Sequence, residues 1–127
     1  MKYTKSYKQF LYYSFFGLIC LSIDLLVYLF LTQTLGLLKS KSKIISFVLA
    51  STCSFILNRK FTFEVKRFKI KQPINFLIIY SISLLFNSLT HDFFQDRFDG
   101  LLPFAIATSI SVLINFTGQK FWVFLKN

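Results

Sequence analysis

The sequence is poor in charge, glycine, proline, cysteine and histidine, and each shortage excludes a class of protein. Charged residues make up 16% of the 127 residues, against about 25% in an ordinary soluble domain. Four Gly, two Pro and two Cys exclude collagen-like, disordered and disulfide-rich chains. The rest is 54% hydrophobic with eighteen Phe, more apolar surface than one small soluble domain can bury. The composition therefore indicates a small integral membrane protein.

The usual signatures of catalysis and of metal or cofactor binding are missing from the sequence. It has one histidine, His91, and no group of Cys, His, Asp and Glu at the spacing of metal ligands. It also has no Gly-rich phosphate loop and no nucleophile motif. We therefore predict no metal, no cofactor and no enzymatic activity. Cys20 and Cys53 both fall in apolar runs, which favours buried thiols over a disulfide.

Four apolar runs predict an all-α integral membrane four-helix bundle, with residues 1–127 forming a single domain. The helices are expected at approximately 10–31, 43–58, 74–90 and 101–119. The second run has only 14 uncharged residues, or about 21 Å of helix, against a hydrocarbon core of about 30 Å. It can still span the bilayer if Lys43 and Arg59 extend their charged ends to the two interfaces.

The distribution of Lys and Arg predicts that both termini are cytoplasmic. The two termini and the loop between the second and third helices together carry 11 basic residues, and the opposite side carries four. Basic residues are enriched on the cytoplasmic side of membrane proteins. The net charge of +10 is thus explained by topology, and we predict no nucleic-acid partner.

Each predicted helix carries small or polar residues at steps of three and four, which lie on one face. Helix packing in lipid explains Gly17, Ala50, Ser54 and Ala105. It explains Asp24 less well, because a carboxylate in a span costs about 2.5 to 3.5 kcal/mol on insertion scales.

Asp24 lies about 21 Å along its span from the cytoplasmic start, which separates it from the basic residues at the cytoplasmic boundary. Three roles remain open for it. It can couple transport to protons, accept hydrogen bonds from a polar cargo, or bond another helix through one of three polar residues: Tyr80, Asn87 or Thr108.

The second and fourth helices end in similar sequences, which align residue by residue without a gap. An amide is followed by a cation and then by two aromatic residues. The matching pairs are Phe55 and Phe116, Asn58 and Gln119, Arg59 and Lys120, Phe61 and Trp122, and Phe63 and Phe124. An interfacial belt of aromatics and cations is common at helix ends, but it does not require an amide before the cation. The pattern predicts an internal duplication of two helices, with the two copies in parallel orientation.

The sequence resembles the GtrA-like membrane proteins of bacterial cell-surface polysaccharide glycosylation over nearly its whole length. The resemblance rests on Phe10, Gly17 and Asp24 in the first helix and on the two helix ends. Phe61 stands where the family often has Trp. The resemblance implies a four-helix protein of the bacterial cytoplasmic membrane that flips a polyprenyl-phosphate-linked sugar to the outer leaflet. A separate glycosyltransferase there transfers the sugar to O-antigen, teichoic acid or a related polymer.

That role assigns functions to the residues of the helix ends. Cations would capture the lipid phosphate, and those available are Arg59, Lys60 and Lys120. The sugar headgroup would be contacted by four hydrogen-bonding side chains, those of Asn58, Asn115, Gln119 and Asp24. Phe61 and Trp122 would stack on the sugar or fix the depth of the helices. The partners implied are the sugar lipid, membrane lipids and glycosyltransferases of the same pathway.

Two other functions fit the same sequence. The protein can be a non-transporting subunit that stabilises a glycosyltransferase in the membrane. It can also be a proton-coupled exporter of small cations that uses Asp24, although the basic helix ends would repel a cationic cargo. Because four helices are few to enclose a headgroup path, we further expect a homo-oligomer.

Overall fold

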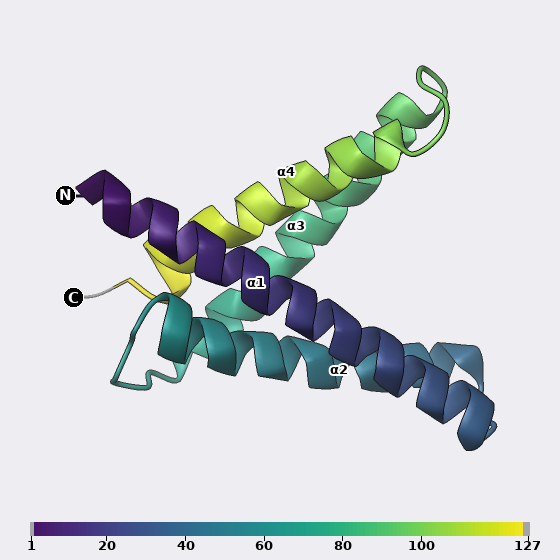
Figure 1. The fold of residues 1–127 in the computed structure, drawn as a ribbon, viewed down its shortest axis with the longest axis horizontal. Helices are drawn as coiled ribbons and strands as arrows, with labels where there is room; N and C mark the ends of the chain where they lie inside the picture. Colours follow the sequence, from purple (N-terminus) through teal and green to yellow (C-terminus); the bar gives the residue numbers. More distant parts are fainter. Residues whose placement is uncertain (1, 126–127) are drawn as a thin grey trace. The chain divides into compact units, whose positions relative to one another are not determined.

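All regular structure in residues 2–125, the part of the chain described by the computed structural model, is helical. The four long helices are α1 (Lys2–Leu29), α2 (Lys39–Leu57), α3 (Lys71–Gln95) and α4 (Leu102–Gly118) (Figure 1). Each is part of a segment long and apolar enough to cross a membrane. The predicted all-α fold with four membrane spans is confirmed. Lys126, one of the basic residues behind the predicted orientation, lies outside the described residues.

Three of the helices end in a π-helical turn, in which the backbone hydrogen bond reaches one residue further than in an α-helix. These turns are η1 (Phe30–Thr34) after α1, η2 (Asn58–Thr62) after α2 and η3 (Gln119–Val123) after α4. Helix α3 ends at Gln95 without a π turn. The second and fourth helices thus share a feature at their ends that the third lacks.

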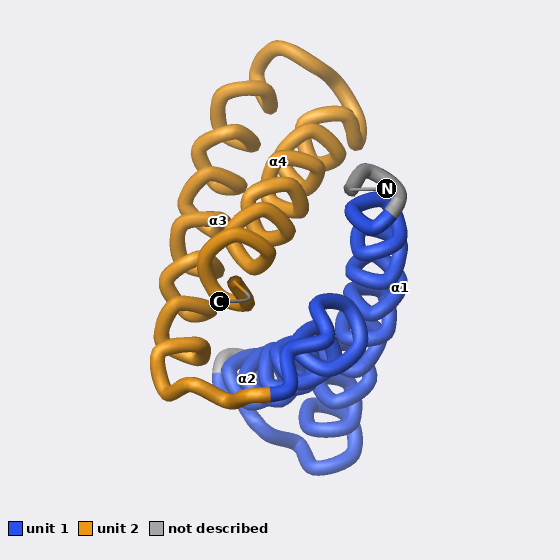
Figure 2. The backbone as a smooth tube through the Cα atoms, turned by 90° about the vertical axis from the view of Figure 1, so that its left-hand side faces the viewer, with its two compact units in different colours: residues 1–66 blue, residues 67–127 orange. Residues whose placement is uncertain are grey.

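The chain divides into two compact units, residues 1–66 and 67–127 (Figure 2). Each unit is a hairpin of two helices, with α1 packed on α2 in the first and α3 packed on α4 in the second. The division falls in the loop after η2, so each unit contains one of the two matching helix ends. This division agrees with the predicted duplication of a two-helix repeat.

Helices α1, α2 and α3 begin ahead of the apolar runs that predicted them, whereas α4 lies within its predicted range and only the π turn η3 continues beyond it. Helix α2 begins at Lys39, so the three lysines before the second run lie within the helix rather than ahead of it. Helix α3 runs from Lys71 to Gln95, beyond its predicted range at both ends. The apolar run marks only the part of a helix suited to hydrocarbon, whereas a helix keeps its backbone hydrogen bonds as it continues through the interface. The continuous segment Lys41–Thr62 has 22 residues, enough to remove the doubt about the second span.

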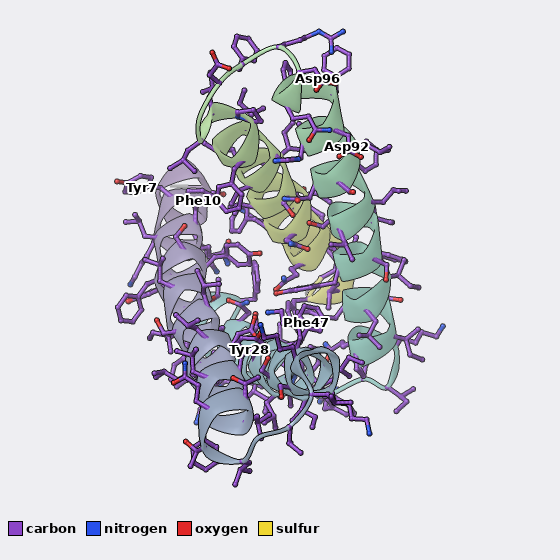
Figure 3. The ribbon with its side chains drawn as sticks, turned by 90° about the vertical axis from the view of Figure 1, so that its right-hand side faces the viewer. Tyr7, Phe10, Tyr28, Phe47, Asp92 and Asp96 are labelled. Atoms are coloured by element: carbon purple, nitrogen blue, oxygen red, sulfur yellow. The ribbon has the colours of Figure 1, made fainter. Side chains whose placement is uncertain are left out.

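Glycine and proline define the hairpin turns. Gly36 and Gly100 adopt φ angles of 65° and 70°, in the left-handed region that glycine enters at little cost. Pro103 occupies the first turn of α4, where its missing N–H removes no hydrogen bond. Asp92 and Asp96 lie at the end of α3 beside the loop to α4 (Figure 3).

The interfaces within the two hairpins contain small and polar residues, while large apolar side chains project outward (Figure 3). In the first hairpin Ala50 and Ser54 are buried, as predicted, whereas Gly17 is exposed because the buried positions of α1 fall at Tyr13 and Cys20. Ala105 is also exposed, and Ala107 is the buried alanine of α4. Cys20 and Cys53 are free thiols; Cys20 is buried, as predicted, whereas Cys53 is only half-buried.

In the second hairpin, helices α3 and α4 are joined by a hydroxyl pair and by one close backbone approach. The Ser83 and Ser111 hydroxyls are 2.5 Å apart, and Ser83 Oγ also donates to the Ser111 carbonyl at 3.1 Å. At Gly118 an added Cβ would lie 2.5 Å from Ile79 Cδ1 and 2.8 Å from its Cγ2. Since Ile is stiff at χ1, Gly118 is the residue that lets α4 approach α3.

We predict that Gly118→Ala lowers the melting temperature of the detergent-solubilised protein, because the new methyl group forces Ile79 away from α4. Gly17→Ala is the matched control, since nothing lies within 4 Å of its Cβ position. It should leave the melting temperature unchanged or raise it, as Ala stabilises a helix interior by about 0.8 to 1.0 kcal/mol relative to Gly. Equal melting temperatures for the two variants would contradict the close approach.

Candidate functional site

The candidate functional residues lie at two helix ends, one in each hairpin, which we call the first exit (residues 58–63) and the second exit (residues 119–124). In each, the helix widens into a π turn at the same repeat position. The Phe63 N–H donates to the Asn58 carbonyl at 2.8 Å, and the Phe124 N–H donates to the Gln119 carbonyl at 2.8 Å. Because π turns are rare overall and frequent at functional sites, their recurrence at equivalent positions of the two repeats marks both exits.

The two exits also bury their side chains in the same order. The first, fifth and sixth residues are buried, the second is half-buried, and the third and fourth are exposed. The amides of Asn58 and Gln119 are therefore inside, and the cations Arg59 and Lys120 are at the boundary. The alignment predicted from sequence is matched by both the backbone conformation and the burial.

Arg59 positions the loop that follows the first exit. One terminal guanidinium nitrogen, Nη2, donates to the Lys66 carbonyl at 3.0 Å. The Arg59 carbonyl accepts from the Val65 N–H at 2.8 Å. Between these two bonds Glu64 has a φ of 53°, a left-handed conformation that is unfavourable for a non-glycine residue. Arg59 thus holds the strained loop that follows η2 in place. The sequence did not predict this structural role.

The other cations of the exits lie over aromatic rings. The Nζ atom of Lys60 is 5.2 Å from the centroid of Phe61, and that of Lys120 is 5.3 Å from the centroid of Phe121. These distances are within the range of cation–π attraction.

The fourth residue of each exit is a half-exposed aromatic, Phe61 at 45% and Trp122 at 47%. The Phe61 ring also contacts Phe16 of α1, at 5.6 Å between centroids.

Asn115 lies one helical turn before Gln119 and is half-buried, with its Oδ1 atom inside. It therefore lies just ahead of the second exit, on the same face of the helix as Gln119. Of the other residues predicted to bind the headgroup, Asp24 lies in α1, outside both exits.

Asp24 bonds α2 rather than a residue of the exits. Its Oδ2 atom is 2.5 Å from Lys43 Nζ, and its Oδ1 atom accepts from Ser46 Oγ at 2.6 Å. Lys43 precedes Arg59 by 16 residues in a continuous helix, which is about 24 Å, so Asp24 is remote from Arg59, as expected. A bond to a neighbouring helix was among its predicted roles, but Lys43 and Ser46 were not among the predicted partners.

The ion pair of Asp24 and Lys43 could have been predicted from the position of Lys43 in the sequence. The apolar runs placed this residue at the edge of the second span. Because α2 begins four residues earlier, at Lys39, Lys43 lies inside the helix opposite α1. The Asp24 side chain is 13% exposed and the Lys43 side chain 58%. The ion pair therefore lies at the rim of the hairpin, with the Lys43 side chain reaching outward.

We predict that Lys43→Met lowers the melting temperature more than Asp24→Asn does, because it leaves a largely buried carboxylate without its counter-charge. In Asp24→Asn the new amide oxygen would still accept from Ser46 Oγ. The loss in Lys43→Met should be well below the about 3 to 5 kcal/mol seen when one partner of a fully buried pair is removed, since Lys43 is largely exposed. Thermal unfolding in detergent measures both variants.

The double variant Asp24→Asn with Lys43→Met should recover most of the stability lost in Lys43→Met, because no unpaired charge remains. Asp24→Leu, which loses both bonds, should be less stable than Asp24→Asn. Additive losses in the double variant would show that the ion pair does not stabilise the hairpin.

Among residues 2–125, no group of three or more His, Cys, Asp and Glu could hold a metal ion.

A family model described as the GtrA/DPMS transmembrane domain matches residues 12–124. This range includes both hairpins and both exits, and the match associates the chain with the handling of lipid-linked sugars in a membrane. No curated protein and no solved structure matches the chain.

Proposed function

Since the chain belongs to the GtrA/DPMS transmembrane-domain family, we propose that it moves a polyprenyl-phosphate-linked sugar across the bacterial cytoplasmic membrane. The sugar would serve the glycosylation of a cell-surface polysaccharide such as O-antigen or teichoic acid. The observation that carries this proposal is the repeated exit. In each copy a half-buried cation stands between a buried amide and an exposed aromatic ring.

The cargo of such a protein has three parts, and the structure offers a matching surface for each. The phosphate requires cations at the interface, which Arg59, Lys60 and Lys120 supply. Arg59 suits phosphate oxygens best, because its planar guanidinium can donate two parallel hydrogen bonds. The polyprenyl tail can remain in lipid beside the apolar outer faces of the helices.

The sugar requires hydrogen-bonding groups and an aromatic surface. In the second exit the buried amide of Gln119 directly precedes the cation Lys120, and Asn115 lies one helical turn before it. Phe61 and Trp122 are exposed enough to stack on a sugar ring. Transport of this kind breaks no covalent bond, so it requires no catalytic group and no cofactor.

Of the two alternative functions, one fits the structure less well and the other is separated from ours by experiment. A proton-coupled cation exporter would rely on Asp24 as its titrating group, but Lys43 and Ser46 already bond both oxygens of that carboxylate. A non-transporting subunit of a glycosyltransferase would share the exits but would not move the lipid. Transport assays of the purified protein separate that alternative from ours.

We predict that Arg59→Ala lowers the rate of flipping by about ten- to a hundredfold, because a charge-assisted hydrogen bond contributes about 1.5 to 3 kcal/mol. Arg59→Lys should recover only part of the rate, since an ammonium replaces the planar fork. The rate is measured in proteoliposomes that contain a fluorescent polyprenyl-phosphate sugar, as its accessibility to an external quencher.

Lys66→Ala is the matched control for that experiment. It removes a neighbouring positive charge but keeps the backbone carbonyl to which Arg59 donates, so it should flip at close to the wild-type rate. A wild-type rate for Arg59→Ala would exclude Arg59 from phosphate capture. Absence of flipping by the wild-type protein, with normal binding of the lipid, would favour the glycosyltransferase subunit.

We further propose that both termini and the basic loop after η2 face the cytoplasm. Single cysteines at Lys41 and Lys69, in a background of Cys20→Ala and Cys53→Ala, test this orientation. A maleimide that does not cross the membrane should label Lys41→Cys in intact cells, and Lys69→Cys only after the cells are opened. The reverse labelling pattern would invert the topology.

A further inference from the structure

The two exits occupy the same repeat position but differ in the hydrogen bonding of their amides. In the alignment of the two repeats, Asn58 corresponds to Gln119. The residues one turn to either side also correspond in position and differ in type. Ser54 and Thr62 flank the first amide, while Asn115 and Val123 flank the second.

In the first exit the amide is bonded on both sides within its own helix. Asn58 Nδ2 donates to Ser54 Oγ at 3.2 Å, and Thr62 Oγ1 donates to Asn58 Oδ1 at 2.9 Å. Asn58 is 1% exposed and Thr62 is 2% exposed. This ladder of three side chains satisfies the amide at both its donor and its acceptor.

In the second exit the corresponding amide has no such ladder. The Gln119 side chain is fully buried, and neither its Nε2 atom nor its Oε1 atom has a hydrogen-bond partner among the described residues. Val123 stands where Thr62 donates in the first exit, and it has no hydroxyl. Exchanging the amide nitrogen and oxygen of Gln119 would not alter this difference, because both atoms are unbonded.

Asn115 extends the same unbonded surface. Its Oδ1 atom is buried and also lacks a partner within the described part of the chain, and it lies four residues before Gln119, on the same face of the helix. Since buried polar groups in proteins are nearly always bonded, three unbonded atoms one turn apart, both polar atoms of the Gln119 amide and the oxygen of Asn115, indicate a ligand that completes them.

The chemistry of these groups identifies the class of ligand. A phosphate has only acceptor oxygens and would leave the carbonyl oxygens of both amides unbonded. A sugar hydroxyl is both donor and acceptor, so neighbouring hydroxyls of a sugar ring can bond an amide at its nitrogen and at its oxygen. The pair of Asn115 and Gln119 therefore fits a polyhydroxyl headgroup.

We infer that the second exit recognises the sugar through Gln119 and Asn115, and that Asn58 in the first exit is a structural residue. This inference rests on the proposed function, because it divides the work between the two copies of the exit. The first exit bonds its amide within its own helix, and the second exit keeps unbonded amide atoms that can distinguish one headgroup from another.

Three leucine variants of the full chain in lipid nanodiscs test this division. Asn58→Leu should lower the melting temperature by about 3 to 6 °C, because it leaves Ser54 and Thr62 without their common partner. Gln119→Leu and Asn115→Leu should leave it unchanged or raise it, since they remove buried amide atoms that have no partner in the unliganded protein.

The same variants are then compared with and without lipid. The probes are polyprenyl phosphates that carry glucose, galactose, N-acetylglucosamine or arabinose, and sugar-free polyprenyl phosphate as their control. In the wild type, at least one sugar lipid should raise the melting temperature further than the sugar-free lipid does. In Gln119→Leu that additional shift should disappear, while the shift caused by the sugar-free lipid remains.

Each outcome decides a separate question. If no sugar lipid exceeds the sugar-free lipid in the wild type, or if Gln119→Leu keeps the additional shift, the second exit does not recognise the sugar. A loss of stability in Gln119→Leu as large as that in Asn58→Leu would mean that bound water, rather than a ligand, completes the amide. A sugar-dependent shift in a protein that does not flip the lipid would overturn the proposed transport and leave the recognition site in place.

Discussion

A polar group within a membrane must find its partner inside the protein, because lipid supplies neither donors nor acceptors. The internal arrangement of both hairpins follows from this constraint. The Ser83 and Ser111 hydroxyls bond each other across α3 and α4, and Asn58 is bonded within its own helix. The pair of Asp24 and Lys43 meets the same requirement with charges at the rim of the first hairpin. Against this background the unbonded side-chain atoms of Gln119, Asn115 and Ser42 are exceptions, and Gln119 stands out because both polar atoms of its amide are unbonded.

The four spans and the two exits could be predicted because each is encoded in a short continuous stretch of sequence. A run of apolar residues identifies a span by its length alone, and the two exits match residue by residue in the sequence. The same locality accounts for the errors at the helix ends. Charged residues such as Lys39 and Lys71 stop an apolar run but do not stop a helix, so the helices are longer than the runs.

Contacts between helices were harder to predict, because they depend on the rotation of one helix against another. The pairing of Asp24 with Lys43 requires knowing that α2 already exists at Lys39 and which of its faces meets α1. For the same reason Gly17 was expected in a packed interface and is exposed, whereas Gly118 permits the close approach to Ile79. The contrast between Asn58 and Gln119 was visible in the sequence as Ser54 and Thr62 against Asn115 and Val123, four residues to either side.

The π turn at each exit contains one more residue than an α-helical turn, and this extra residue determines which of the following side chains face inward. In an α-helix a residue five positions further on points about 140° away, so Phe63 would not share a face with Asn58. The backbone bond from Phe63 to Asn58 closes the ring over five residues, and Asn58, Thr62 and Phe63 are buried together. The same holds for Gln119, Val123 and Phe124. The π turn thus brings Phe63 and Phe124 onto the buried face, and a regular α-helix of the same sequence would turn both aromatic side chains away from that face.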